Sequence, residues 1–194
     1  MWGEGDGREQ AWPGNAAAAI ASGSNYLMAF NEPELSSQAN IPDPAVCAQK
    51  YIQYMQPFAG KAKLCSPSVT DNTAPGTGLD YMSQFLDACN GLGCQVDVLC
   101  IHTYKTYDAI DYFKQQLVNA YALTNNQTNI WVTEWGVTNG TPEQQAQYIT
   151  DAIEFMDSQP WVERQSYFYI DPQDPILVDA SGAPNTLGEA YISA

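Results

Sequence analysis

Residues 26–34, Tyr-Leu-Met-Ala-Phe-Asn-Glu-Pro-Glu, and residues 130–136, Ile-Trp-Val-Thr-Glu-Trp-Gly, carry the pattern that decides the fold class. Each segment starts as a short apolar run rich in aromatic or β-branched residues and then changes to a carboxylate. Short runs that are apolar almost throughout are typical of strands covered on both faces, as in a parallel sheet. We therefore predict two parallel strands, followed by Glu32 and Glu134.

The same pattern recurs along the chain. Further β-rich runs occupy residues 62–65, 96–101 and 166–170, and segments with helical spacing lie around residues 43–58, 82–89, 113–120 and 141–156. Asp43 before a proline predicts a helix start, and Thr141 with Gln144 predicts a capping box. Alternating strands and helices imply right-handed crossovers in a parallel sheet, and the length favours one domain over residues 1–194.

Two architectures fit this alternation, an open doubly wound sheet and a (β/α) barrel. The open Rossmann-type sheet is disfavoured because the sequence lacks a Gly-x-Gly-x-x-Gly turn after its first strand and any Gly-x-x-x-x-Gly-Lys motif. We therefore predict an α/β fold of the (β/α)8 TIM-barrel type.

The charge balance limits the partners. Seven Lys and Arg face 22 Asp and Glu, a formal net charge of −15, which repels phosphate backbones and anionic lipids. We expect no nucleic acid and no membrane partner, and no apolar run approaches the roughly 18 residues of a membrane span. The first residues lack the pattern of a signal peptide, although a secreted protein can occur as a trimmed chain. Glycosylation triplets at Asn126 and Asn139 favour secretion.

The five cysteines leave two readings open. Cys89 and Cys94 flank a short turn, Asn-Gly-Leu-Gly, and either close a small disulfide or stay as buried thiols. Cys65 and Cys100 lie in apolar runs and are expected to be packed thiols. With one histidine and no Cys-x-x-Cys pair, we expect no zinc or other metal site.

Polar residues follow each predicted strand. Glu32, His102, Tyr104, Glu134 and Asp171 all come at or just after a strand end, and the carboxyl ends of barrel strands share one rim. Two carboxylates among aromatic side chains suit glycoside hydrolysis, in which one protonates the leaving oxygen and the other acts at the anomeric carbon. Their separation distinguishes retaining enzymes, at about 5–5.5 Å, from inverting ones, at about 6.5–9.5 Å.

Asn-Glu-Pro at residues 31–33 and Thr-Glu-Trp-Gly at residues 133–136 resemble the corresponding motifs of the fungal-type glycoside hydrolase family 128. This family, the glycosyl hydrolase catalytic core group, consists of β-1,3-glucanases of the retaining (β/α)8 clan. The likeness extends over most of the chain and includes Met-Trp-Gly at residues 1–3, Lys-Leu-Cys-Ser-Pro at 63–67, His-Thr-Tyr at 102–104 and Trp-Val-Glu-Arg at 161–164.

The resemblance implies a role for each matching residue. Glu32 would be the general acid/base, Glu134 the nucleophile, and Asn31 a partner of the sugar 2-hydroxyl. The residues expected to bind substrate are Trp2 and Trp135 as stacking platforms, Asn31, His102, Tyr104 and Tyr169. For His102, Tyr104, Trp135 and Tyr169 a packing role is the alternative, and Glu34 is expected to be a surface acid or rim contact. The resemblance implies no cofactor.

The first residues depart from the family pattern. In the family, two strands precede the one that ends in Trp-Gly, and here Trp2 and Gly3 open the sequence. With about six of eight strands visible, we expect a domain that lacks the first two strand–helix units. The leading expectation is a monomeric, secreted or cell-wall-associated endo-β-1,3-glucanase. The alternatives are a catalytically impaired carbohydrate-binding or cell-wall protein, and a glycosidase acting on another β-glucan linkage.

Overall fold

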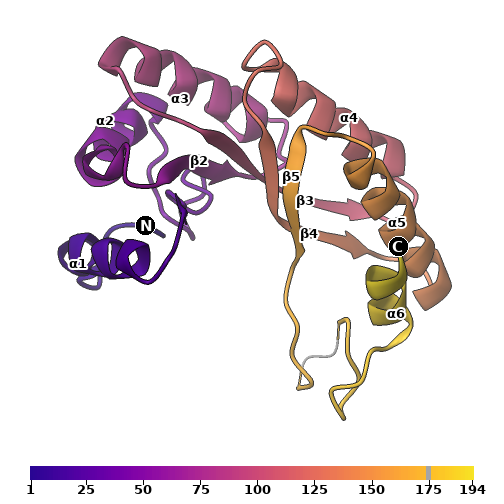
Figure 1. Ribbon diagram of the computed structural model, residues 1–194. Helices are drawn as coiled ribbons and strands as arrows, with labels where there is room; N and C mark the ends of the chain where they lie inside the picture. Colours follow the sequence, from indigo (N-terminus) through magenta and orange to yellow (C-terminus); the bar gives the residue numbers. More distant parts are fainter. Residues whose placement is uncertain (174–175) are drawn as a thin grey trace.

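The computed structural model describes residues 1–173 and 176–194. Its centre is a parallel sheet in which each strand pairs with its neighbour in the sequence, in the order β1-β2-β3-β4-β5 (Figure 1). The strands are β1 Tyr26–Leu27, β2 Lys63–Val69, β3 Val98–Thr106, β4 Ile130–Thr138 and β5 Val162–Tyr167. They form half of a barrel, so the predicted α/β barrel class is confirmed in a partial form.

Helices connect successive strands and lie along the convex face of the sheet, and one further helix precedes the first strand and another follows the last (Figure 1). They are α1 Arg8–Ala21, α2 Pro44–Tyr54, the single 3-10 turn η1 Gln56–Phe58, α3 Gly78–Leu92, α4 Ile110–Ala122, α5 Pro142–Asp157 and α6 Thr186–Ser193. The predicted starts of two helices are confirmed. Asp43 accepts hydrogen bonds from the first backbone amides of α2, and Thr141 with Gln144 forms the capping box of α5.

Three strands extend beyond their predicted ends because polar residues continue them. Ser66 lies inside β2, His102 inside β3 and Glu134 inside β4. The prediction of a strand at residues 166–170 is wrong, since β5 spans Val162–Tyr167. This is an edge strand with exposed Glu163 and Arg164, so it lacks the continuous apolar character used to recognise the others.

The sixth expected strand, at Trp2 and Gly3, is not a strand in this structure. The segment nevertheless lies beside the chain that follows β1, because the backbone amide of Asn31 donates to the carbonyl of Trp2 at 2.8 Å. The amino group of Met1 donates to the carbonyl of Met28 at 2.6 Å. Residues 1–3 thus align with the first strand without a regular ladder.

The main hydrophobic core fills the space between the sheet and the helices, where Leu99, Ile101 and Val132 lie in one cluster with Phe85 and Phe113. A smaller cluster lies on the other, concave face and comprises Cys65, Val98, Cys100 and Trp131, with Tyr26 packed against it. The rings of Tyr26 in β1 and Trp131 in β4 are 4.5 Å apart although two strands separate them. The sheet is therefore strongly curved.

The cysteines divide into a bonded pair and buried thiols. Cys89 and Cys94 form a disulfide where α3 ends, and Cys47, Cys65 and Cys100 are free and buried. Within residues 1–173 and 176–194, helices that are long and apolar enough to cross a bilayer do not occur.

Candidate active site

Glu32 lies just beyond β1 in a backbone conformation that side chains rarely adopt. Its φ angle is +42°, and it is held by a hydrogen bond from its amide to the carbonyl of Ser68 at 2.8 Å and by one from the amide of Leu35 to its carbonyl at 3.0 Å. A left-handed conformation at a residue other than glycine costs roughly 1–3 kcal/mol and persists where the surroundings enforce it. The result is a carboxylate that is only 9% exposed.

His102 and Glu134 face each other on neighbouring strands. They are register partners between β3 and β4, directly after an irregularity at Ile101 and His102. Nδ1 of His102 lies 2.8 Å from Oε1 of Glu32 and 3.4 Å from Oε2 of Glu134. The imidazole, 2% exposed, therefore lies between the two carboxylates and fixes their relative position.

Tyr104 completes this group from the same strand as His102. Its hydroxyl donates to Oε2 of Glu134 at 2.9 Å. Burial of the hydroxyl, and then its hydrogen bond to Glu134, raise the pKa of Tyr104 well above its usual value, so the O–H persists as a donor at neutral and mildly alkaline pH. The ring lies over Gly136, where an added Cβ would come within 3.2 Å of the ring of Tyr104.

Sequence reasoning missed Phe168. This side chain is 44% exposed and makes an edge contact with Tyr104 at a centroid distance of 5.8 Å. Tyr169 stacks on Phe168 at 5.7 Å and donates its hydroxyl to Asp171. The run of aromatic residues at 167–169 was the available signal, but it was interpreted as a strand.

Trp2 and Asn31 lie at the β1 end of the sheet, whereas Phe168 and Tyr169 follow β5 at its other end. Trp2 is 44% exposed, with the guanidinium of Arg8 4.9 Å from its ring centre. The side-chain amide of Asn31 donates to Oε1 of Gln38 at 3.2 Å. Asn31 precedes Glu32 in the sequence, and its backbone amide donates to the carbonyl of Trp2, which brings Trp2 near Glu32.

The prediction that Trp135 is a stacking platform is wrong. Trp135 is 0% exposed and packs against Phe113 and Tyr167 on the helix side of the sheet, and its indole N–H donates to Gln165 at 2.7 Å. Successive residues of a strand point to opposite faces. With Glu134 directed to the carboxyl-end rim, its neighbour is directed into the core.

Of the two alternatives expected for Glu34, a surface acid or a rim contact, its hydrogen bonds are those of a rim contact. Its Oε1 accepts hydrogen bonds from the amide and hydroxyl of Thr70, at 2.7 and 2.9 Å, and from the amide of Gly78 at 3.3 Å. Glu34 thus joins the loop after β1 to the loop after β2 and to the start of α3. Its role in this structure is to hold the rim together beside Glu32.

Glu32, His102 and Glu134 are also ligand types for a divalent cation, and one ligand atom from each lies within 4.8 Å of the others. The expectation of no metal site considered only cysteine and histidine spacing and did not foresee this group. Metal bonds of about 2.0–2.1 Å hold tetrahedral ligands about 3.3 Å apart. The 2.8 Å contact between His102 and Glu32 is shorter and is that of a direct hydrogen bond.

The fold and the site together define the class of the protein: a parallel half-barrel that holds two neighbouring carboxylates, Glu32 and Glu134, at the carboxyl ends of its strands. The chain belongs to the glycosyl hydrolase catalytic core family, whose model matches residues 1–191. The resemblance to glycoside hydrolase family 128 is confirmed by this match together with solved structures of that family.

Solved structures of that family share the fold over nearly the whole chain. A curdlan-specific exo-β-1,3-glucanase from Blastomyces gilchristii, of family 128 subgroup III and in complex with glucose, is 36% identical, with a TM-score of 0.90 and coverage of 100% of this chain and 80% of its own. A subgroup IV endo-β-1,3-glucanase from Lentinula edodes is 26% identical, with a TM-score of 0.76 and coverage of 91% and 72%.

Alkali-sensitive linkage protein 1 of Schizosaccharomyces pombe is a curated relative, 30% identical over 196 residues and 92% of this chain. The match covers 34% of that protein, so this chain spans about a third of its length.

Proposed function

We propose that this chain is the catalytic domain of a retaining β-1,3-glucanase, with Glu32 as acid/base and Glu134 as nucleophile. The observation that carries the proposal is that Nδ1 of His102 lies 2.8 Å from Glu32 and 3.4 Å from Glu134, so that one oxygen of each carboxylate lies within 4.8 Å of the other. Oxygens that approach this closely favour the retaining class, whose carboxyl groups are roughly 5–5.5 Å apart, over the inverting class, at roughly 6.5–9.5 Å. The β-1,3 linkage is supported by solved relatives described as exo- and endo-β-1,3-glucanases.

The hydrogen bonds of the two acids differ, and the difference supports the two roles. Oε2 of Glu134 accepts from Tyr104, an arrangement suited to an ionised nucleophile that accepts hydrogen bonds only. Glu32 uses Oε1 toward His102, while no described residue forms a side-chain hydrogen bond with its Oε2. We assign the acid proton to this Oε2, from which it can be given to the leaving oxygen, while Oε1 keeps its contact with His102.

The reaction proceeds in two displacements. Glu134 attacks the anomeric carbon while Glu32 gives its proton to the departing glucan oxygen, which leaves a glycosyl ester on Glu134. Glu32, now ionised, takes a proton from water, and the resulting attack on the anomeric carbon releases Glu134 and restores the β configuration. Phe168 and Tyr104 would offer apolar surface to sugar rings.

The test is the pair Glu134→Gln and Glu32→Gln, assayed on a soluble β-1,3-glucan with product anomers followed by proton NMR. Each variant should lose turnover by at least a thousandfold while oligosaccharide binding persists, and the first product of the unaltered chain should be the β anomer. Glu154→Gln on α5 is the matched control and should behave like the unaltered chain. Substantial turnover by Glu134→Gln, or a first product of α configuration, would refute the proposal.

A carbohydrate-binding protein with impaired catalysis is the alternative candidate. Assaying this chain beside a version extended upstream separates the two, because binding without hydrolysis in both would support the binding protein.

The Cys89–Cys94 disulfide supports a secreted or cell-wall setting, since disulfides persist in oxidising compartments.

A further inference from the structure

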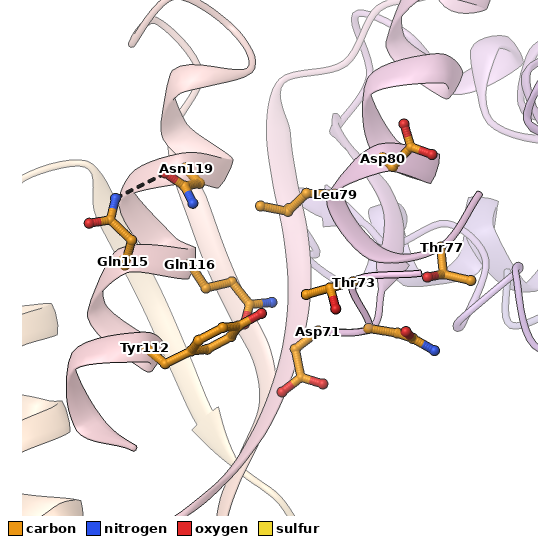
Figure 2. A pocket seen from close by; sticks show the side chains of 10 residues that line it. Asp71, Thr73, Thr77, Leu79, Asp80, Tyr112, Gln115, Gln116 and Asn119 are labelled. Carbon is orange, nitrogen blue, oxygen red and sulfur yellow. Dashed lines mark hydrogen bonds between the residues drawn. The ribbon is translucent and has the colours of Figure 1, made fainter. Parts of the chain in front are cut away.

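A cavity of about 240 Å³ lies outside the catalytic group, between the loop that follows β2 and the outer face of α4. Asp71 and Thr73 of the loop and Leu79 at the start of α3 form one wall, and residues of α4 form the other. Figure 2 shows Tyr112 and Gln116 extending from α4 toward Asp71 and Thr73. The volume is below the roughly 300–1,000 Å³ of pockets for drug-sized ligands and suits a single small ring.

Gln116 is a buried polar side chain with unused hydrogen-bonding capacity at this cavity. It is 6% exposed, and its Oε1 accepts only a long hydrogen bond, 3.4 Å, from the hydroxyl of Thr103. Among the described residues, none accepts a hydrogen bond from its Nε2, and Gln116 lines the cavity. In the described part of the chain, the buried polar side-chain atoms without a partner are Oε2 of Glu34 and the hydroxyl of Tyr148, so Nε2 of Gln116 is accessible from the cavity. Water or a polar ligand in the cavity can accept its hydrogen bond.

The surrounding groups favour a neutral ligand with hydroxyls. The carboxylate of Asp71 is paired with Lys105 at 2.6 Å, and that of Asp80 accepts from the amide of Gly76 at 2.6 Å and from the side chain of Gln84. Lys105 balances the charge of Asp71, whereas Asp80 has neutral donors and keeps its negative charge, which disfavours an anionic ligand. Its remaining polar lining consists of neutral amide and hydroxyl side chains, namely Asn72, Thr73, Thr77, Gln115, Gln116 and Asn119.

An aromatic ring stands at the same place. Tyr112 is 44% exposed, and Lys105 lies 4.2 Å from its ring centre. Amides that donate and accept, combined with an exposed aromatic ring, match a sugar, which presents hydroxyls at its edge and C–H groups on its faces. We propose that this pocket binds one hexose unit of a neutral glucan at a second site beside the active site. The choice of a glucose unit rests on the proposed function, whereas the pocket and its chemistry do not.

Asp71 connects the two sites. Its Oδ2, which lines the pocket wall, also accepts a hydrogen bond from the backbone amide of Tyr104 at 3.0 Å. The side chain of Tyr104 contacts Glu134. A glucan held at the second site is therefore kept close to the catalytic carboxylates, which raises the local concentration of substrate.

The test uses laminaritriose and the Glu134→Gln variant, in which hydrolysis does not interfere. Nitrogen–proton NMR spectra follow the side-chain amides of Gln115, Gln116 and Asn119 during the titration, and the ring signals of His102 report on the active site. The pocket amides should shift in a saturable manner. Tyr112→Ala and Gln116→Met should each weaken binding at the pocket at least tenfold and leave the His102 response unchanged.

Gln147→Ala is the matched control, because Gln147 forms an exposed contact with Asp151 four residues along α5, as Gln115 does with Asn119 on α4. It should leave both responses unchanged. Pocket amides that stay still while laminaritriose saturates His102 would overturn the second site alone. A response to glycerol equal to that with laminaritriose at the same concentration would also overturn it. Pocket shifts without any His102 response would instead contradict the proposed function and retain the second site.

Discussion

Replacing Tyr104 by Phe removes a single oxygen from the candidate site. The hydroxyl donates to Oε2 of Glu134 at 2.9 Å, while the ring packs edge-on against Phe168 and lies over Gly136. Phenylalanine keeps the ring and both of these contacts. Any change in rate therefore reports on the hydrogen bond to the nucleophile.

The size of the effect follows from the exposure of the two partners. A hydrogen bond to a charged group contributes about 1.5–3 kcal/mol. Tyr104 is 36% exposed and the side chain of Glu134 is 28% exposed, so solvent screens the interaction and the lower end applies. About 1.4 kcal/mol corresponds to about a tenfold loss in kcat/KM. The loss should fall on kcat, because the hydrogen bond orients the attacking carboxylate.

The assay is steady-state hydrolysis of laminari-oligosaccharides between pH 6 and about pH 9. The pKa of Tyr104 is raised, chiefly by burial, so its hydroxyl stays protonated and the ratio of rates between the two proteins should not vary across this range. Tyr121→Phe is the control, since its ring stacks on Trp161 on the far side of α4. A Tyr104→Phe variant within twofold of the unaltered kcat/KM would refute the positioning role.

Three further outcomes are expected. Gly136→Ala should lower kcat severalfold in the same assay, because its Cβ would approach the Tyr104 ring within 3.2 Å and shift it; an unchanged kcat would contradict this. Trp135→Ala should destabilise the fold by about 3–5 kcal/mol in urea unfolding, and a selective rise in KM with no loss of stability would restore the platform role. Glu4→Gln should lower Tm at pH 7, because the hydrogen bond from Lys50 lowers the pKa of Glu4 and the ionised Glu4 therefore stabilises the fold. This stabilisation is fully present above the usual carboxyl pKa of about 4.3 and is lost as the pH falls through the lowered pKa. The Tm difference between the two proteins should therefore vanish near pH 2, and a difference that persisted there would exclude the ionic origin.

The strand ends were the part of the site that sequence could locate. Each apolar run ended near a polar residue, and parallel strands bring their carboxyl ends to one rim, so Glu32, His102 and Glu134 could be expected together. The positive φ of Glu32 could not be foreseen, because tertiary hydrogen bonds to Ser68 and Leu35 enforce it. The backbone preferences of the residues around Glu32 do not predict a conformation that tertiary contacts enforce.

Two errors have a common cause. The platform role of Trp135 was implied by the family resemblance. The predicted strand ended before Glu134 and Trp135, so the alternation of side-chain directions along a strand was not applied to them. The structure continues β4 through Thr138, and the alternation then directs Trp135 into the core. Likewise, Phe168 was hidden in a predicted strand, although β5 ends at Tyr167 and leaves it exposed.

The order of the strands in the sheet is also the order in which a ribosome produces them. Each new strand–helix unit finds its pairing edge already made by the unit before it, and no strand must wait for a distant one to arrive. Each strand pairing closes a loop of 31–37 residues, so assembly needs only contacts between consecutive strand–helix units. Among the described strands the sheet can therefore extend from β1 toward β5 during translation, and the two glutamates come together only when β4 has been added.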